Sequence, residues 1–209
     1  MITNLNEHWN AAYNKEEEQL GWFEANPMQT MELVNACNLQ KDATILNVGA
    51  GTTSLIDSLL EEGYTNLIAN DLSDLALDKL KQRVKKSHNY NLSCIKDDLT
   101  NPQQLNKLQS IDLWIDRAVL HFFLTEAEQR AYFNLIQKIV SNNGYVIIAV
   151  FSLEGAQKCC GLDIKRYNLE MLQKNLGSHF KLINTFNYTF INPFGGERPY
   201  IYTLFQRQV

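Results

Sequence analysis

One stretch limits the possible folds of this chain more than any other. The apolar run 43–48 ends directly in Gly49-Ala50-Gly51, and a helical pattern opens at Thr52. Apolar residues then recur at helical spacing, at Leu55, Ile56, Leu59 and Leu60. The run has the length of a buried strand. The stretch therefore predicts a strand, a tight glycine turn and a helix in direct succession.

This succession is typical of a Rossmann-like nucleotide site. Glycines let the backbone approach a ligand closely, and the N-terminus of the following helix offers unpaired N–H groups. The turn does not select the nucleotide. A dinucleotide site needs Gly or Ala where Ser54 stands, and a methyltransferase motif has glycine where Thr53 stands. A buried turn without any ligand is a further alternative.

Length and composition indicate one globular domain. The chain has 209 residues, of which 45% are hydrophobic and 20% charged, enough for one full core. Its net charge of −4 argues against a nucleic-acid partner. The four cysteines lack metal-ligand spacing, so we expect reduced thiols and no metal site. The N-terminus does not resemble a leader and no apolar run has membrane length. We therefore expect a soluble, cytoplasmic protein without a membrane partner.

The remaining pattern predicts helices that alternate with strands. Two helices, 5–20 and 28–37, precede the glycine turn. Beyond it we expect strands at 66–70, 92–96, 111–115 and 145–151, helices from Ser73 to about 86 and over 125–140, and a turn at Asn143-Gly144. A loop over 155–166, a helix over 167–176 and two strands at 180–190 and 199–206 complete the chain. Alternation implies a parallel sheet, to which the last hairpin adds an antiparallel pair.

Three acidic residues follow predicted strands, at the edge where open α/β sheets bind ligands. Asp71 lies 22 residues after Gly49, the spacing of a carboxylate that takes ribose hydroxyls. Asp98 ends the third strand and could accept a hydrogen bond from an adenine amino group. Asp116 ends the fourth strand, where we expect the reaction centre. Each acid alone could equally be a solvated strand end or a helix cap.

With these motifs in order, the chain resembles the class I S-adenosylmethionine-dependent methyltransferases from about residue 8 to residue 206. The resemblance implies an α/β fold, a Rossmann-like three-layer sandwich with a seven-stranded, mostly parallel sheet in the order 3-2-1-4-5-7-6. It implies S-adenosylmethionine as cofactor and S-adenosylhomocysteine as product. The implied cofactor contacts are Asn47, Gly49, Ala50, Gly51, Thr53, Asp71, Leu72, Asp98, Leu99, Asp116 and Trp22.

Two of these positions depart from the family pattern. The family usually has Asp or Glu where Asn47 stands, and glycine where Thr53 stands. Asn keeps the hydrogen-bonding geometry and loses the charge, which would weaken cofactor binding. A non-catalytic protein that binds S-adenosylmethionine therefore stays open as an alternative.

The resemblance also divides the chain into parts. We expect a single methyltransferase domain over 1–209, with N-terminal helices and a lid in 1–40, a cofactor-binding half in 43–151 and an acceptor-side half in 152–209. The aromatic residues of the first part, Trp9, Tyr13, Trp22 and Phe23, form either this lid or ordinary packing. This aromatic pattern is similar to lysine methyltransferases of elongation factors and citrate synthase, and to thiopurine methyltransferases. The segment 116–122 looks most like uncharacterised bacterial class I methyltransferases.

Three residues after the fourth strand are candidates for catalysis. Asp116 and His121 would provide a general base, and Arg117 would bind or orient an acidic group. Alternatively, Arg117 pairs with Asp116, and His121 is a core histidine among apolar neighbours. Cys159 and Cys160 are most simply structural thiols. The basic residues of the helix after Ser73, which include Arg83, are expected to form a solvated face.

The expected function is methyl transfer to a small molecule or a protein. A protein-lysine methyltransferase is the narrower alternative. No Asn/Asp-Pro-Pro-Tyr/Phe string follows the fourth strand, which disfavours methylation of a nucleobase. An NAD-dependent oxidoreductase is disfavoured by the two leading helices and by the lack of room for a substrate domain. The sequence does not identify the acceptor or the oligomeric state.

Overall fold

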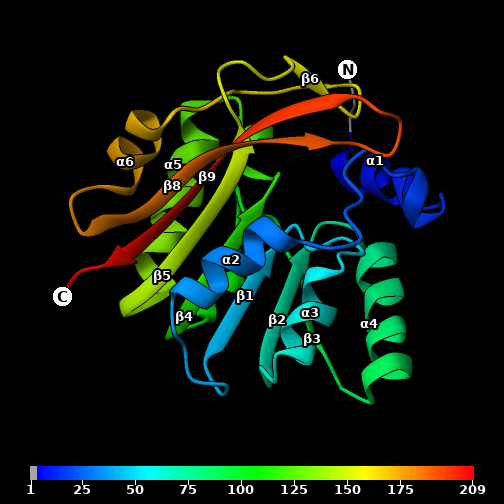
Figure 1. Cartoon of the computed structure of the whole chain (residues 1–209), viewed down its shortest axis with the longest axis horizontal. Coiled ribbons are helices and arrows are strands. Elements are labelled where there is room, and N and C mark those ends of the chain that lie inside the picture. Colours follow the sequence, from blue (N-terminus) through cyan, green and yellow to red (C-terminus); the bar gives the residue numbers. More distant parts are fainter. Residues whose placement is uncertain (1–3) are drawn as a thin grey trace.

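The computed structural model describes residues 4–209, and its centre is one seven-stranded sheet in the order β3-β2-β1-β4-β5-β9-β8 (Figure 1). The first five strands are parallel, and β9 and β8 are antiparallel. The bounds are β1 Thr44–Val48, β2 Asn66–Asp71, β3 Ser93–Lys96, β4 Ile111–Arg117, β5 Val140–Phe151, β8 Phe180–Ile191 and β9 Glu197–Arg207. Counted as seven successive strands, this is the predicted order 3-2-1-4-5-7-6, which is confirmed.

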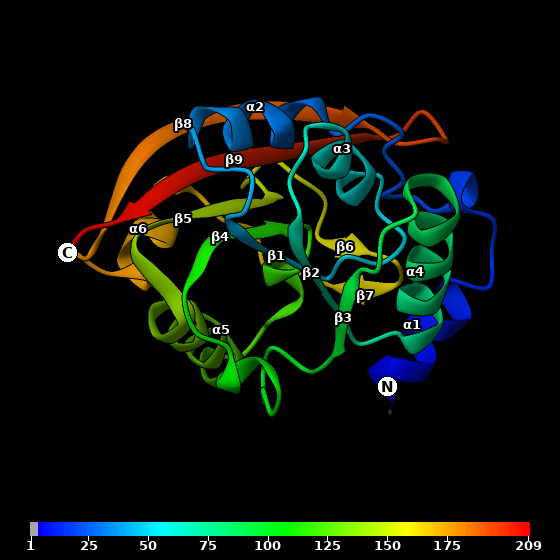
Figure 2. The same cartoon turned by 90° about the horizontal axis from the view of Figure 1, so that it is seen from below.

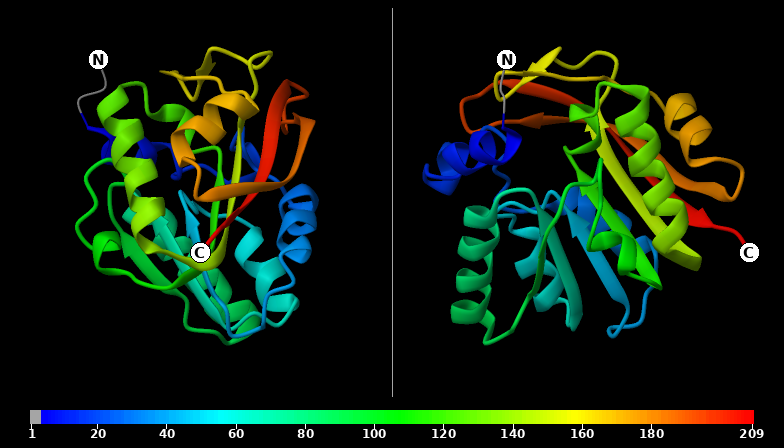
Figure 3. Two further views of the ribbon diagram at one scale, coloured as in Figure 1. Left: turned by 90° about the vertical axis from the view of Figure 1, so that its left-hand side faces the viewer. Right: turned by 180° about the vertical axis from the view of Figure 1, so that it is seen from behind.

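Helices cover both faces of the sheet and complete the predicted three-layer sandwich. On one face lie α2 Met28–Ala36, α3 Leu55–Glu61 and α4 Asp74–His88. On the other lie α5 Glu126–Ile139 and α6 Leu169–Leu176. Figure 2 shows α2 and α3 on the side of the sheet opposite α5, and Figure 3 shows α5 and α6 from behind. Successive residues of β1 alternate between the two cores, Ile45 toward α2 and α3 and Leu46 toward α5.

The N-terminal segment differs from the predicted helix over 5–20. Helix α1 spans Leu5–Ala12, and a separate 3-10 turn, η1, spans Glu17–Gln19. Tyr13 and Leu20 turn inward and form a small buried cluster with Ala76 of α4. In an unbroken helix Tyr13 and Leu20 would share one face but lie roughly 10 Å apart along the axis, instead of meeting in one cluster. Tertiary packing therefore ends the helix at Ala12.

The helix after the glycine turn begins later than predicted, at Leu55 instead of Thr52. The reason is a side chain from another element. Arg83 of α4 donates hydrogen bonds to the carbonyl oxygens of Thr52 and Thr53, at 2.9 and 2.5 Å. The first backbone hydrogen bond of α3 runs from Ser58 N–H to the carbonyl of Ser54.

Two irregular segments were also predicted incompletely. Asn143-Gly144 is a bulge inside β5 and not a turn before it, since the pairing with β4 shifts from Ile111↔Val140 to Leu113↔Tyr145. The loop predicted over 155–166 contains a hairpin of two short strands, β6 Lys158–Cys159 and β7 Leu162–Asp163. Two further 3-10 turns are η2 Leu105–Lys107 and η3 Leu120–Phe122.

Segments that are far apart in the sequence meet at the carboxyl edge of the parallel strands. Helix α1 and the β6–β7 hairpin both lie at this edge (Figure 1). Within residues 4–209, every helix is too short or too polar to cross a membrane.

Candidate functional site

Two adjoining cavities lie at the carboxyl edge of the sheet. The larger has a volume of about 330 Å³ and the smaller about 50 Å³. Trp22, Gly49 and Arg117 line both, so the glycine turn and the end of β4 lie between them. Parallel strands end at this edge, where α/β sheets commonly bind their ligands.

The two glycines of the turn allow close approach of neighbouring segments. Gly49 and Gly51 have φ of 56° and 53°, the left-handed region that favours glycine. A Cβ on Gly49 would overlap the side chain of Val119, and a Cβ on Gly51 would overlap the ring of Tyr13. Both positions therefore require glycine for two independent reasons.

The Asp71 carboxylate holds the turn and lines the larger cavity. One oxygen accepts a hydrogen bond from the Gly51 N–H and the other from the Ser73 N–H, each at 2.8 Å. Burial raises the pKa of Asp71 to about 6, against the opposing effect of these N–H donors. Leu72 lines the same cavity. The position of Asp71 at the larger cavity is compatible with the ribose contact predicted for it.

The two residues predicted for adenine, Asp98 and Leu99, line the larger cavity as well. One Asp98 oxygen accepts hydrogen bonds from the N–H and the hydroxyl of Thr100, at 2.8 and 2.7 Å. The neighbouring Asp97 also lines the cavity, and its carboxylate accepts backbone hydrogen bonds from residues 103–105. The loop after β3 thus presents acidic groups that are themselves fixed by short hydrogen bonds.

The smaller cavity collects buried polar atoms that lack partners. Within residues 4–209, Thr30 Oγ1, Asn47 Oδ1 and Arg117 Nη2 make no hydrogen bond, although each is buried, and all three residues line this cavity. Gly49, Ala50, Thr52 and Thr53 contribute the opposite wall. Buried polar groups without partners cost about 1–3 kcal/mol each, so three around one cavity indicate a binding site for a polar group.

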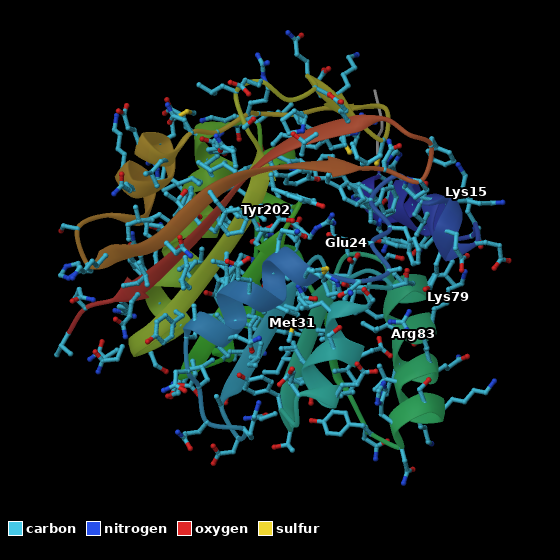
Figure 4. The ribbon with its side chains drawn as sticks, in the orientation of Figure 1. Lys15, Glu24, Met31, Lys79, Arg83 and Tyr202 are labelled. Atoms are coloured by element: carbon cyan, nitrogen blue, oxygen red, sulfur yellow. The ribbon has the colours of Figure 1, made fainter. Side chains whose placement is uncertain are left out.

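Arg117 pairs with Glu24 and not with Asp116. Its Nε lies 3.0 Å from Glu24 Oε2, and its Nη1 donates to the Trp22 carbonyl at 3.2 Å. Its Nε also lies 3.4 Å from the Tyr202 hydroxyl. Burial raises the pKa of Glu24, and the nearby guanidinium opposes this shift. Figure 4 shows Glu24, from the segment before α2, and Tyr202, from β9, near the centre of the molecule.

The other two candidates for catalysis lie behind the cavity walls. Asp116 is fully buried, and its carboxylate accepts hydrogen bonds from Val119 N–H, Leu120 N–H and the Tyr132 hydroxyl. His121 is also fully buried and packs against the rings of Phe122 and Phe151. Neither Asp116 nor His121 lines either cavity. Tyr167, expected near the acceptor pocket, is buried outside both as well.

The aromatic residues of the N-terminal segment line the cavities and also pack against one another. Trp22 packs edge-to-face against Trp9 and Tyr13, with ring centroids 5.8 and 5.7 Å apart. Trp9, Tyr13 and Trp22 line the larger cavity, and Trp22 and Phe23 line the smaller. Ring packing and cavity lining therefore occur in the same residues.

Sequence reasoning missed several residues of the site. Thr30 and Glu24 gave no signal because they belong to no motif. Arg83 was assigned to a solvated face, yet its guanidinium bonds Glu17 and Asp57 in addition to the carbonyls of the turn. Cys159 and Cys160, interpreted as structural thiols, line the larger cavity.

The larger cavity is apolar with an acidic rim. Its acidic residues come from four segments: Asp71, Asp97, Asp98, Glu128 and Asp163. Arg117, already paired with Glu24, is its one basic residue among the described part of the chain. Residues 4–209 contain no cluster of three or more His, Cys, Asp or Glu side chains that could hold a metal ion.

Comparison with known proteins extends this description. Residues 45–144 match a family described as "Methyltransferase domain". The chain is similar to EEF1A lysine methyltransferase 2 of Danio rerio, with 25% identity over 156 residues. That alignment covers 68% of this chain, and the chain spans 66% of the relative's length, just under two thirds.

Two solved structures share the fold at low sequence identity. One is a SAM-dependent methyltransferase from Anabaena variabilis, with TM-score 0.75 and 12% identity, covering 98% of this chain and 96% of the other. The second is 1,6-didemethyltoxoflavin-N1-methyltransferase from Burkholderia thailandensis, with bound 1,6-didemethyltoxoflavin and S-adenosylhomocysteine. It has TM-score 0.74 and 17% identity, and the match covers 98% of this chain and 88% of the other.

Proposed function

We propose that this chain, whose residues 45–144 match a methyltransferase domain, methylates a neutral molecule or an amine with S-adenosylmethionine and releases S-adenosylhomocysteine. The observation that carries the proposal is the group of three buried, unpartnered polar atoms around the smaller cavity. The bound S-adenosylhomocysteine of the Burkholderia thailandensis neighbour supports the choice of cofactor.

The residues of the smaller cavity fit the amino-acid end of this cofactor. Its α-carboxylate needs donors, and Arg117 Nη2 and Thr30 Oγ1 are available. Its α-ammonium group needs acceptors, and Asn47 Oδ1 and the Glu24 carboxylate line the same cavity. The Glu24 carboxylate, from the segment before α2, would thereby supply the negative charge that the family has at position 47 and that Asn47 lacks.

The adenosine end of the cofactor would occupy part of the larger cavity. We assign the ribose to Asp71 with Leu72, and the adenine to Asp98 with Leu99, as the resemblance implied. All four residues line that cavity. Gly49, Ala50 and Thr53 would contact the cofactor between its two ends, and Trp22 would cover it. Gly51, which was predicted as a contact, lines neither cavity because Tyr13 packs against it, and it would act through the shape of the turn.

When bound, S-adenosylmethionine supplies a methyl group on a positively charged sulfur, which is already activated. The protein then has to exclude water and hold an acceptor, a proximity effect that is worth about 7–11 kcal/mol in favourable cases. The rings of Trp9, Trp22 and Phe122 provide the apolar wall for this task.

Asp116 acts on the site indirectly in this proposal. Asp116 fixes the turn that follows β4 through two backbone N–H groups, and this turn presses Val119 against Gly49. Its carboxylate is a positioning group, and Arg117 is a cofactor-binding group.

The charge of the larger cavity indicates the class of acceptor. The carboxylates that the cofactor assignment does not use, those of Asp97, Glu128 and Asp163, repel an anionic acceptor and favour an amine. An amine that binds in its protonated form gives its proton to solvent or to one of these carboxylates before its lone pair takes the methyl group. A protein-lysine acceptor is a second candidate, because the Danio rerio relative is named a lysine methyltransferase. A small-molecule acceptor accords with the bound 1,6-didemethyltoxoflavin of the structural neighbour.

We further propose that the single domain is divided as the sequence predicted. Residues 1–40 would supply the lid, 43–151 the cofactor-binding half and 152–209 the acceptor side. The first three residues of the lid segment lie outside the described residues.

Calorimetric titration tests the cofactor assignment. We expect S-adenosylmethionine and S-adenosylhomocysteine to bind, and NAD not to bind. Arg117→Met should weaken binding of S-adenosylhomocysteine roughly ten- to hundredfold, the value of one or two hydrogen bonds to a charged group. Arg130→Met, on the exposed side of α5, is the matched control.

5′-Methylthioadenosine, which lacks the amino-acid end, separates the two ends of the site. Its affinity should be the same for the native protein and for Arg117→Met. Equal weakening of both ligands would contradict the assignment of Arg117 to the α-carboxylate. Folded protein that binds neither sulfur nucleotide would refute the proposed function.

The acceptor class is tested by release of S-adenosylhomocysteine in the presence of a panel of compounds. Amines and lysine-bearing proteins should be methylated, and carboxylates or phosphates of similar size should not. Methylation of the carboxylates or phosphates alone would contradict the argument from the charge of the cavity.

A further inference from the structure

The β6–β7 hairpin places two thiols at the wall of the larger cavity, and the buried His121 imidazole, which lies outside that cavity, acts on one of them. Cys159 Sγ and Cys160 Sγ lie 3.5 Å apart, and both residues line the cavity. His121, from η3, is fully buried, and within residues 4–209 neither of its ring nitrogens makes a hydrogen bond. The proposed methyl transfer uses none of these three groups.

The backbone of the hairpin gives no structural reason for a cysteine at its tip. Lys158 pairs with Asp163 and Cys159 with Leu162, so Cys160 and Gly161 alone form the turn. Their φ values of 54° and 79° are both positive. Such two-residue turns favour Asn-Gly, and a cysteine in the left-handed region is strained. Strained residues of this kind cluster at functional sites.

Electrostatics at the hairpin favour a thiolate on Cys159. The hydrogen bond from the Cys160 thiol lowers the pKa of Cys159, and His121 acts in the same direction against the effect of burial. The pKa of Cys160 is raised by the same pairing. The other titratable or charged groups that act on the two thiols are Arg198, Lys15, Tyr13 and Tyr200.

We propose that Cys159 is a nucleophilic modification site, with His121 as its proton acceptor and Cys160 as its hydrogen-bond donor, for small carbon electrophiles that enter the larger cavity. The thiol proton passes to the His121 imidazole. The thiolate sulfur attacks the electrophilic carbon, a C–S bond forms, and the leaving group departs with the electron pair of the broken bond. The adduct would stand in the larger cavity, because Cys159 lines it.

Competitive alkylation with limiting iodoacetamide, read by peptide mass spectrometry, tests the proposal on the intact protein. Cys94 is an internal reference, because it is half-buried like Cys159 and burial raises the pKa of its thiol. At pH 6, Cys159 should react at least tenfold faster than Cys94. Between pH 6 and 9 the rate at Cys159 should rise much less with pH than the rate at Cys94, because the pKa of Cys159 is lowered and that of Cys94 is raised.

Two variants separate the roles of the neighbours. His121→Gln removes the proton acceptor and should slow alkylation of Cys159 at pH 6 several-fold, with no change at Cys94. Cys160→Ala removes the donor and should slow Cys159 in the same way, and Cys160→Ser, which keeps a hydroxyl donor, should restore much of the rate. The Cys160 variants keep the test decisive if His121→Gln does not fold.

The proposal is overturned if Cys159 reacts no faster than Cys94 at pH 6, or if both rates rise with pH in parallel. Preferential alkylation of Cys160 would also overturn it, since the roles of the two thiols would then be reversed. Because iodoacetamide needs no cofactor, these outcomes are independent of methyl transfer.

Discussion

At the scale of single residues, the site depends on positions where the backbone leaves no room for a side chain. Gly49 and Gly51 combine a left-handed backbone with neighbours from η3 and the α1–η1 segment, Val119 and Tyr13. Since Tyr13 and Val119 also line the larger cavity, these contacts join the glycine turn to the walls around it.

The first prediction concerns Gly51→Ala. Left-handed strain of about 1–2 kcal/mol and overpacking of about 1–3 kcal/mol should add to a loss of roughly 2–5 kcal/mol in the free energy of unfolding. Gly161 has the same kind of backbone, and a Cβ there would meet no other atom, so Gly161→Ala should be destabilised by the backbone strain alone. Urea denaturation measures both. Equal losses would mean that Tyr13 moves aside without cost.

A second residue-scale feature is the buried carboxylate of Asp116. Burial raises its pKa from the usual 3.8 to about 6, and the hydrogen bond from Tyr132 opposes this shift. The folded protein therefore binds more protons at this site than the unfolded chain between about pH 4 and pH 6. Stability contributed by Asp116 is present at the acidic end of this range and is lost as the pH rises through 6.

The second prediction follows from this sign. The free energy of unfolding of the native protein should fall, relative to that of Asp116→Asn, as the pH rises from 4 to 6, and the difference should be constant above pH 7. Denaturant titrations at several pH values measure it. A difference that is independent of pH, or that grows with pH, would contradict the raised pKa.

At the scale of elements, α4 holds the glycine turn through Arg83. The guanidinium contacts Glu17 of η1, Asp57 of α3 and the carbonyls of Thr52 and Thr53. Figure 4 shows Arg83 on α4. One side chain thus connects three segments, and it explains why α3 begins at Leu55.

The third prediction is a loss of about 1.5–3 kcal/mol in the free energy of unfolding for Arg83→Met, the value of hydrogen bonds to a charged group. Binding of S-adenosylhomocysteine should weaken as well, because the carbonyls of the turn lose their donors. Lys85→Met, exposed on the same helix, is the control and should change stability by less than about 0.5 kcal/mol. Unchanged ligand affinity in Arg83→Met would show that the turn keeps its shape without this residue.

At the scale of the whole molecule, segments from both ends of the chain meet around the cavities. The smaller cavity joins β1 and β4 to Thr30 of α2 and to Glu24, and the larger adds α1 and the β6–β7 hairpin. A ligand that fills both would connect the N-terminal segment, the parallel sheet and the last third of the chain.

The fourth prediction is stabilisation by ligand. At about 100 times its dissociation constant, S-adenosylhomocysteine should add about 2.7 kcal/mol to the free energy of unfolding and raise the melting temperature by roughly 5–10 °C. NAD should have no effect. Differential scanning fluorimetry with and without each ligand measures the shift. A shift with NAD alone would reassign the cofactor.

The sequence by itself determined the strand, glycine turn and helix, and the acids at the strand ends. These features follow from local periodicity, from glycine conformation and from the rule that parallel strands end at one edge. The strand order was implied by the resemblance to class I methyltransferases. The sheet was predicted correctly because each strand is a short apolar run between turn residues. Asp71 and Asp98 could be placed at the cavity for the same reason.

Only the tertiary structure decided which side chains meet. Thr30, Asn47 and Arg117 are far apart in the sequence, and so are Cys159 and His121; no local pattern marks such pairs. The ends of α1 and α3 were also decided by distant residues, by the packing of Tyr13 in one case and by Arg83 in the other. Asp116 and Arg117 are adjacent in β4, where successive side chains point to opposite faces. One therefore lies behind the wall and the other faces the cavities.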